Sequence, residues 1–193
     1  GVFEMTEAGL KAIPNPSELF LAERQEGSPG SAVVATLEGS RPMLVEVQAL
    51  VSPTSFGTPR RMSIGIDPNR TTLLLAVLEK RVGLALLGDD VFVSVVGGLE
   101  VTEPAADLGV AAAVASSFRN RPLPPRTVLF GEVGLGGEVR GAGQAALRIR
   151  EAVQLGFTRC ILPASTALGP QDGIRLVGVR TLEEALARLD DPD

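Results

Sequence analysis

The residues that could carry out covalent chemistry are few in this chain of 193 residues. It contains no histidine, a single cysteine (Cys160) and two lysines, Lys11 and Lys80. Without histidine, neither a Ser-His-Asp nor a Cys-His arrangement can activate a nucleophile. A Ser/Lys mechanism of peptide hydrolysis needs a serine hydroxyl whose proton is taken by a lysine held neutral in a desolvated pocket.

Two segments resemble the active-site frame of the Lon-type Ser/Lys proteases: Thr102-Glu-Pro-Ala-Ala-Asp-Leu-Gly109 and Gly131-Glu-Val-Gly-Leu-Gly-Gly-Glu-Val-Arg140. The Lon family has Pro-Lys-Asp-Gly-Pro-Ser-Ala-Gly ahead of a helix and Gly-Glu-aliphatic-x-Leu-x-Gly-x-Val further on. Aligned without gaps, the nucleophilic serine falls on Asp107 and the lysine near Ala146. The resemblance therefore implies the fold of a protease without its catalytic pair.

The chemistry of Asp107 supports this interpretation. An aspartate could form an acyl intermediate only as a mixed anhydride, which is an implausible route to peptide hydrolysis. We expect Asp107 to start a helix or to join a polar network. A residual peptidase that pairs Ser55 with Lys80 is the alternative, and casein turnover abolished by Lys80→Ala would support it.

Basic residues are unevenly distributed although the net charge is −5. Between positions 60 and 81 five cations accompany two anions, Asp67 and Glu79, so the segment carries +5 − 2 = +3. This pattern favours a local basic face that binds phosphates. The candidate DNA contacts are Arg60, Arg61, Arg70, Lys80 and Arg81, with Arg119 and Arg121 as a second group. The alternative is solvated charge or ion pairs between subunits.

The sequence also excludes several kinds of site. Neither lysine has the preceding glycine that a P-loop requires, and the Gly141-Ala-Gly-Gln-Ala-Ala146 match to a dinucleotide motif lacks a preceding parallel strand pattern and the later acidic residue. One cysteine and no histidine exclude the usual zinc sites. Without tryptophan or tyrosine, base stacking is not expected to dominate DNA contacts. We therefore expect no cofactor or metal in this chain.

Alternating apolar patterns predict an α/β fold. Strands are expected at 31–37, 43–51, 62–66, 91–96, 128–130, 159–162 and 176–179, the first two as a hairpin. Helices are expected at 71–81, 105–117, 144–155 and from a capping box at 181–184 to about 189. Cys160 lies in one of the strands and is expected to be a buried core residue. A short helix begins after Asn15, and residues 1–30 are expected to form a connecting arm ahead of a domain at 31–193.

Several motifs occur together in one order: Thr54–Arg61, Asp67-Pro-Asn-Arg70, Leu78-Glu-Lys-Arg81, Glu103–Asp107 and Phe130–Arg140. This set closely resembles the C-terminal Lon-like domain of the bacterial RadA (Sms) DNA-repair family, over most of residues 31–180. The resemblance implies the Lon proteolytic-domain fold, related to the ribosomal protein S5 domain 2-like group, with mixed sheets and packed helices. It makes residues 1–30 the end of a RecA-like ATPase core and the connector that follows it.

The same resemblance implies a longer protein with an N-terminal zinc finger and an ATPase, so that zinc, ATP and magnesium are expected only in those other domains. A cytoplasmic location is expected because the single cysteine allows no disulfide within the chain. The whole would be an ATP-driven motor acting on branched recombination intermediates, in contact with DNA and with other recombination proteins. The Lon-like domain is expected to be proteolytically inactive, to form a homo-oligomer in the shape of a hexameric ring, and to assist DNA binding. A purely structural ring-forming scaffold is the alternative. No membrane partner is expected.

Overall fold

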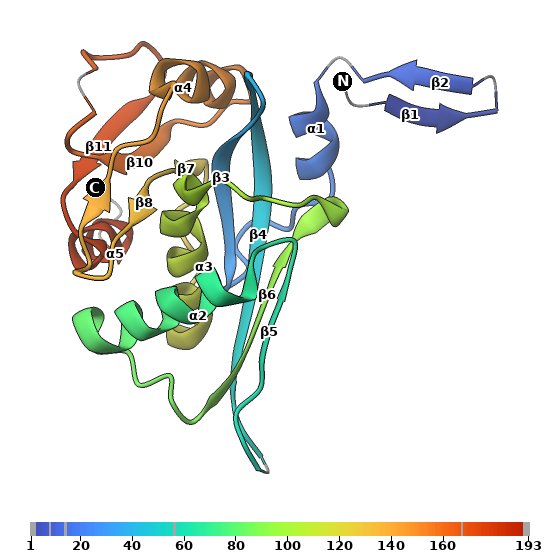
Figure 1. Cartoon of the computed structure of the whole chain (residues 1–193). Coiled ribbons are helices and arrows are strands. Elements are labelled where there is room, and N and C mark those ends of the chain that lie inside the picture. Colours follow the sequence, from blue (N-terminus) through green and yellow to red (C-terminus); the bar gives the residue numbers. More distant parts are fainter. Residues whose placement is uncertain (1–2, 8, 14, 56, 167, 191–193) are drawn as a thin grey trace.

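The computed structural model describes residues 3–7, 9–13, 15–55, 57–166 and 168–190. Its centre is a mixed seven-stranded sheet in the order β11-β10-β7-β3-β4-β6-β5 (Figure 1). The strands of this sheet are β3 (Ser31–Glu38), β4 (Arg41–Pro53), β5 (Arg61–Ile64), β6 (Asp89–Val95), β7 (Thr127–Leu129), β10 (Arg159–Pro163) and β11 (Arg175–Val179). The predicted α/β class is confirmed, whereas the specific Lon-like fold stays a prediction.

The predicted hairpin at 31–51 is the antiparallel pair β3–β4, with Ser31 opposite Gln48. β4 also pairs antiparallel with β6, and β5 joins β6 in parallel as the last strand. β4 is buried on both faces from Met43 to Val47 and then alternates, because Val47 and Ala49 are buried while Gln48 is exposed and Leu50 is 60% exposed. One face of this half of the sheet is therefore core, and the other faces outward.

Helices cover the two faces of the sheet in separate hydrophobic clusters. The first cluster contains side chains of α2 (Pro68–Val77), α3 (Asp107–Arg119) and α5 (Leu182–Asp190), and the second contains those of α4 (Ala145–Gln154). α2 continues into a π-helical turn at Leu78–Val82. Each fully buried aliphatic side chain in these clusters contributes about 1.5–3 kcal/mol relative to exposure. The helices are thus held on the sheet mainly by apolar burial.

α3 lies directly on the sheet because its inner face has small side chains. Gly109 makes this possible, since an added Cβ would lie 1.9 Å from Cγ1 of Val34 on β3. The helix is preceded by a 3₁₀ turn at Pro104–Ala106, as expected from a proline in the first helical turn. The result is that Asp107 begins α3 at a buried position.

Helix ends follow the predicted local rules. Gly156, after α4, adopts φ 79°, the left-handed conformation that favours glycine. At α5 the Thr181 hydroxyl accepts the Glu184 N–H at 3.1 Å, while the Glu184 carboxylate accepts the N–H of Arg180 at 2.8 Å. This is the predicted capping box with its return bond displaced by one residue.

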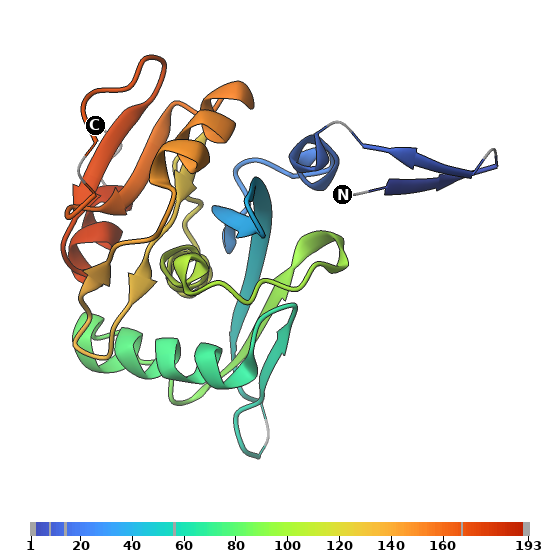
Figure 2. The same ribbon diagram turned by 45° about the horizontal axis from the view of Figure 1, so that its top comes forward.

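The N-terminal segment divides into two parts. A hairpin of β1 (Phe3–Thr6) and β2 (Gly9–Ala12) extends away from the body, whereas α1 (Pro16–Leu21) packs against β4 (Figures 1 and 2). Ser17 of α1 is completely buried; its hydroxyl donates to Glu151 at 2.8 Å and accepts the N–H of Leu44 at 3.0 Å. Of the expected arm at residues 1–30, the β1–β2 hairpin extends away from the rest of the structure, whereas α1 packs against the central sheet. The domain boundary at residue 30 stays a prediction.

Candidate functional site

The two segments that resemble a protease frame lie against each other. The N–H of Leu108 donates to the carbonyl of Gly131 at 3.1 Å, and the N–H of Gly131 donates to the carbonyl of Ala105 at 2.7 Å. The second segment then forms a short hairpin of β8 (Glu132–Val133) and β9 (Val139–Arg140). This backbone pairing fixes Asp107 beside the hairpin.

Asp107 is the acceptor at the centre of a buried polar network. Its carboxylate accepts two hydrogen bonds from the Arg70 guanidinium, one of them from Nε at 2.9 Å, and one from the N–H of Val133 at 3.0 Å. Arg70 also donates to the carbonyl of Val133 at 2.9 Å. α2, α3 and β8 therefore meet at one ion pair, which confirms the expectation that Asp107 starts a helix and joins a polar network.

The pKa of Asp107 is raised, and burial is the largest cause because it disfavours the charged carboxylate. The hydrogen bonds from Arg70 and Val133 act in the opposite direction, because they stabilise the carboxylate. The pKa of Arg70 is raised mainly by its hydrogen bond to Asp107. The position of the aligned lysine, Ala146, is an exposed methyl on α4. The two positions thus offer a structural ion pair and an inert side chain. Ser55 and Lys80, the alternative dyad, are both exposed and share no hydrogen bond among the described contacts.

A cavity of about 460 Å³ lies beside this network. Asp107 and Arg70 line this cavity. So do Asp67 and Glu100, two exposed acidic residues near the N-terminal end of α2. Asp67 caps α2 by accepting the N–H of Asn69 at 2.8 Å. The rim of this cavity is therefore acidic, unlike the predicted basic face.

Arg60 and Arg61 lie at the start of β5. Arg60 pairs with the buried carboxylate of Asp90, donating from Nε at 2.9 Å and from Nη2 at 2.5 Å, and its guanidinium lies 5.5 Å from the ring centroid of Phe92. Arg61 donates to the carbonyl of Leu86 at 2.8 Å. Hydrogen bonds from the Arg60 side chain and N–H and from the Thr54 hydroxyl hold the pKa of Asp90 at about 2.

Lys80 and Arg81 lie in the π-helical turn and are exposed. Arg81 reaches the β8–β9 turn, donating from Nε to the carbonyl of Leu135 at 3.4 Å. The five cations of the first group therefore do not all make the same contacts. Arg70 and Arg81 contact the β8–β9 hairpin, whereas Arg60 and Arg61 contact the strand and loop around Asp90 and Leu86.

The second group of candidate cations is tied to the C-terminal helix. Arg119 lies 2.8 Å and Arg121 3.6 Å from the carboxylate of Asp190. Both pairs are partly exposed, so each contributes little to stability. The side chain of Arg121 is 63% exposed and that of Arg119 is 29% exposed, so a role of these two arginines in binding DNA stays a prediction.

The described residues contain no cluster of three or more histidine, cysteine or acidic side chains able to hold a metal ion. Cys160 is fully buried, and burial raises the pKa of its thiol. Among the described helices, none has both the length and the apolar character that crossing a membrane requires.

Comparison with known proteins identifies relatives over nearly the whole chain. The chain is 53% identical over 188 residues to "DNA repair protein RadA" of Bacillus subtilis (strain 168), which is 96% of this chain and 41% of that protein. The RadA protein of Halalkalibacterium halodurans has the same identity and coverage, and that of Pseudomonas aeruginosa is 51% identical over 192 residues, 98% of this chain and 42% of its own length. No family model matches the chain.

The chain corresponds to a segment of the RadA family. The resemblance noted in the sequence is thereby confirmed at the level of the family. The chain spans about two fifths of the length of the curated relatives it matches, as the shares of 41% and 42% show.

One buried ion pair in this RadA segment was not predicted from the sequence. Arg148 of α4 is completely buried and donates to both carboxylate oxygens of Glu103, one of them at 2.9 Å, and to the carbonyls of Ala35 and Gly143 at 2.6 and 2.9 Å. Its guanidinium also lies 5.5 Å from the ring centroid of Phe130. The available signal was that Arg148 lies one helical turn from Ala145 and Ala152, which pack in the second hydrophobic cluster.

Proposed function

We propose that this chain is a non-proteolytic domain of a RadA-type DNA repair protein and that it binds DNA and forms oligomers. The observation that carries the proposal is the identity of about one half to proteins named for DNA repair, extending over 96–98% of the chain. The whole protein would be an ATP-driven recombination motor, with ATP, magnesium and zinc held by other segments. Other recombination proteins would be further partners.

The DNA contact would be made through phosphates by the exposed cations. Lys80, Arg81 and Arg61 are exposed at the surface, and the side chain of Arg60 is 72% exposed although it is paired with Asp90. Such contacts are independent of sequence and weaken with salt because they release counterions. Arg70 is paired with Asp107, so it would contribute to the positive electrostatic potential of this segment more than to direct phosphate contacts.

Oligomerisation would strengthen this field. Each copy adds the +3 of residues 60–81, whereas the net charge of −5 belongs to the whole chain. Several copies arranged around one DNA would bring their basic segments together and raise the local potential. This supports a role in which ring formation and DNA binding depend on the same domain.

A structural scaffold without DNA contact is the second candidate. It is favoured by the ion pairs of Arg60, Arg70 and Arg119, which already engage carboxylates of the same chain. Under this alternative, Arg60 and Arg61 support assembly, and reversing their charge breaks the oligomer. A third role, peptide hydrolysis, requires casein turnover that Lys80→Ala abolishes; we expect no turnover.

The test is a salt titration of DNA binding by the chain, with its mass measured by light scattering. The variants are Arg60→Ala/Arg61→Ala and Lys80→Ala/Arg81→Ala, and the matched control is Arg150→Ala, an exposed arginine on α4. We expect each phosphate contact that is lost to reduce the slope of log affinity against log salt by about 1. Variants that keep the wild-type mass but lose affinity place these cations on DNA. A wild-type oligomer without affinity for DNA at low salt would favour the scaffold role over DNA binding. Double variants that become monomers would favour it as well.

A further inference from the structure

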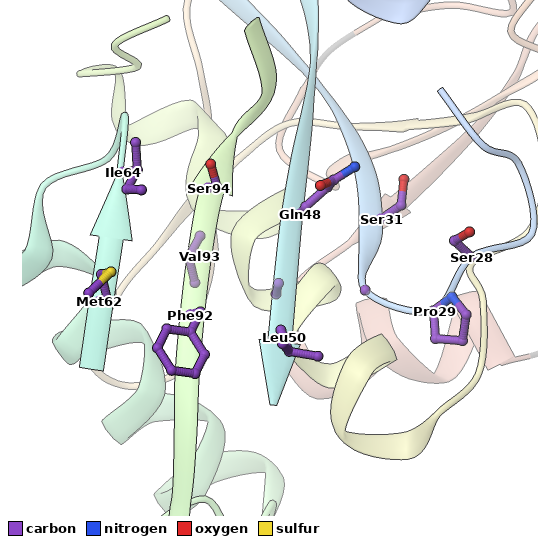
Figure 3. Close-up of a pocket in the computed structure, with 12 residues that line it drawn as sticks. Ser28, Pro29, Ser31, Gln48, Leu50, Met62, Ile64, Phe92, Val93 and Ser94 are labelled. Atoms are coloured by element: carbon purple, nitrogen blue, oxygen red, sulfur yellow. The ribbon is translucent and has the colours of Figure 1, made fainter. Parts of the chain in front are cut away.

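The outward face of β4, β6 and β5 carries a group of exposed apolar side chains, with the Arg60 guanidinium over the ring of Phe92. Leu50, Met62 and Ile64 are 60%, 55% and 57% exposed, and Phe92 lies between them and is partly exposed. Figure 3 shows these four side chains on three adjacent strands, around a shallow depression of about 340 Å³. Single exposed apolar residues are ordinary, but a contiguous group of this kind marks an interaction surface. We call it the sheet face.

A second uncharged surface lies on α2, which packs on the opposite side of the same sheet. The outward residues over two turns of this helix are Asn69, Thr72, Leu73 and Ala76, with Leu73 42% exposed. Exposed helix faces in monomeric proteins normally carry charged side chains. The first charged outward residue after Asn69 is Lys80, beyond the end of α2. We call this stripe the α2 face.

Each surface has one charged end that is opposite in sign to an end of the other, while the C-terminal end of the α2 face carries Lys80 and Arg81. The sheet face is bordered at the start of β5 by Arg60 and Arg61, both exposed. The N-terminal end of α2 is bordered by the exposed carboxylates of Asp67 and Glu100, which line one cavity. Charge complementarity of this kind selects an orientation and disfavours the reverse one.

We propose that the sheet face of one copy of this chain binds the α2 face of the next copy, with Arg60 and Arg61 directed at the partner's acidic margin. In the assembled chain this leaves the DNA contact to Lys80 and Arg81, which are exposed in the π-helical turn. The two surfaces differ and lie on opposite sides of the sheet, so the contact is heterologous and leaves each copy one free surface of each kind. Repetition of such a contact builds a ring or a filament rather than a closed two-fold dimer. The inference rests on the oligomerisation half of the proposed function and identifies its interface.

Pairing of two sheet faces with each other fits the structure less well. It would leave the uncharged α2 stripe exposed to water and would bring no carboxylate margin to Arg61. The heterologous contact buries both apolar surfaces and satisfies both charged margins. Phe92, at the centre of the sheet face, and Arg60, at its border, are also of the residue types that dominate binding energy at protein interfaces.

The test is self-association of the chain and of two variants, Met62→Glu on the sheet face and Leu73→Glu on the α2 face, measured by light scattering and sedimentation. Either glutamate alone should weaken self-association at least about tenfold, because it places a charge in a desolvated apolar contact. An equimolar mixture of the two variants should then form 1:1 dimers, since the intact sheet face of one matches the intact α2 face of the other. Leu10→Glu, which alters a leucine that is 68% exposed on the β1–β2 hairpin, is the control and should assemble like the wild type.

The proposal would be overturned by a monomeric wild-type chain or by a Leu73→Glu variant that assembles normally. It would also be overturned if a mixture of the two variants remains monomeric although each variant melts at the wild-type temperature. Thermal unfolding of each variant excludes loss of fold as the cause. The outcome is separate from that of the DNA proposal, because dimers in the mixture establish the interface whether or not they bind DNA. Equally, DNA binding by a monomeric wild type would reject the interface and keep the DNA contact.

Discussion

Two ion pairs in this molecule have opposite arrangements. In the Arg148–Glu103 pair the arginine is 0% exposed and the carboxylate 24% exposed, whereas in the Arg60–Asp90 pair the arginine is 72% exposed and the carboxylate 2% exposed. The buried partner in each pair also bonds to other groups. Arg148 donates to two backbone carbonyls, and Asp90 accepts the N–H of Arg60 at 2.8 Å and the hydroxyl of Thr54 at 2.8 Å.

The difference shows that an ion pair cannot be judged from the residue types alone. Arg148 has a fixed charge in the interior, and Glu103 is its only anionic partner among the described contacts. Asp90, in contrast, can be neutralised by a proton, and its arginine can swing into solvent. Removal of the partner is therefore most costly for Arg148, because a buried charge left unpaired has no means of escape.

The largest effect is expected from Glu103→Ala. This change leaves Arg148 as an uncompensated buried charge and also removes the acceptor of the Leu37 N–H at 2.9 Å. We expect a loss of about 3–5 kcal/mol in the free energy of unfolding, measured by urea denaturation. Arg150→Ala, which changes an exposed arginine on the same helix, should alter it by no more than about 0.5 kcal/mol. Equal losses in the two variants would show that Glu103 does not compensate a buried charge.

An intermediate effect is expected at Asp107, whose side chain is 4% exposed and whose partner Arg70 is 29% exposed. Asp107→Ala leaves the N–H of Val133 without its acceptor but lets water reach Arg70, so we expect a loss of about 1–3 kcal/mol. Combined with Arg70→Ala in a double-mutant cycle, the two changes should show a coupling of about 0.5–3 kcal/mol. A coupling of zero would mean that the pair across α2 and α3 contributes nothing beyond its separate residues.

Most regular elements of this fold could be predicted from the sequence, because their signals are local. The hairpin at 31–51, the helix ended by Gly156 and the capping box at Thr181 each depend on neighbouring residues. The order of the strands could not be predicted, because it results from packing between distant segments. In the sheet β7 pairs with β3, and β5 forms the edge next to β6. The packing of α1 against β4 was missed for the same reason: it depends on Ser17 reaching Glu151 and Leu44.

One part of the candidate site could be predicted from the sequence: the role of Asp107 as a helix-start acceptor follows from its place after Pro104. The correspondence of positions 107 and 146 to a protease pair stays a prediction. The partners of the cations were not predictable, because Arg70, Arg60 and Arg148 find carboxylates 37, 30 and 45 residues away. A count of basic residues cannot separate cations that are free for DNA from those that hold the fold.

The smallest of these effects concerns pH and the Arg60–Asp90 pair. The pKa of Asp90 is held at about 2, below its ordinary value of 3.8, chiefly by hydrogen bonds from the Arg60 side chain. A carboxyl group whose pKa is lowered in the folded state stabilises it above the unfolded pKa and loses that contribution as pH falls through the folded value. The stabilisation from Asp90 should therefore be complete above about pH 4 and fade between about pH 4 and pH 2.

The measurement is the urea midpoint of the wild type and of Asp90→Asn between pH 2 and pH 6, with Asp172→Asn as an exposed control. The difference between wild type and Asp90→Asn should narrow as the pH falls through this window, because protonation of Asp90 then produces a neutral side chain in both proteins. The control should follow the wild type throughout. A gap that stays constant down to pH 2 would show that the charge of Asp90 does not stabilise the fold, and the contrast between the two ion pairs would then rest on Arg148 alone.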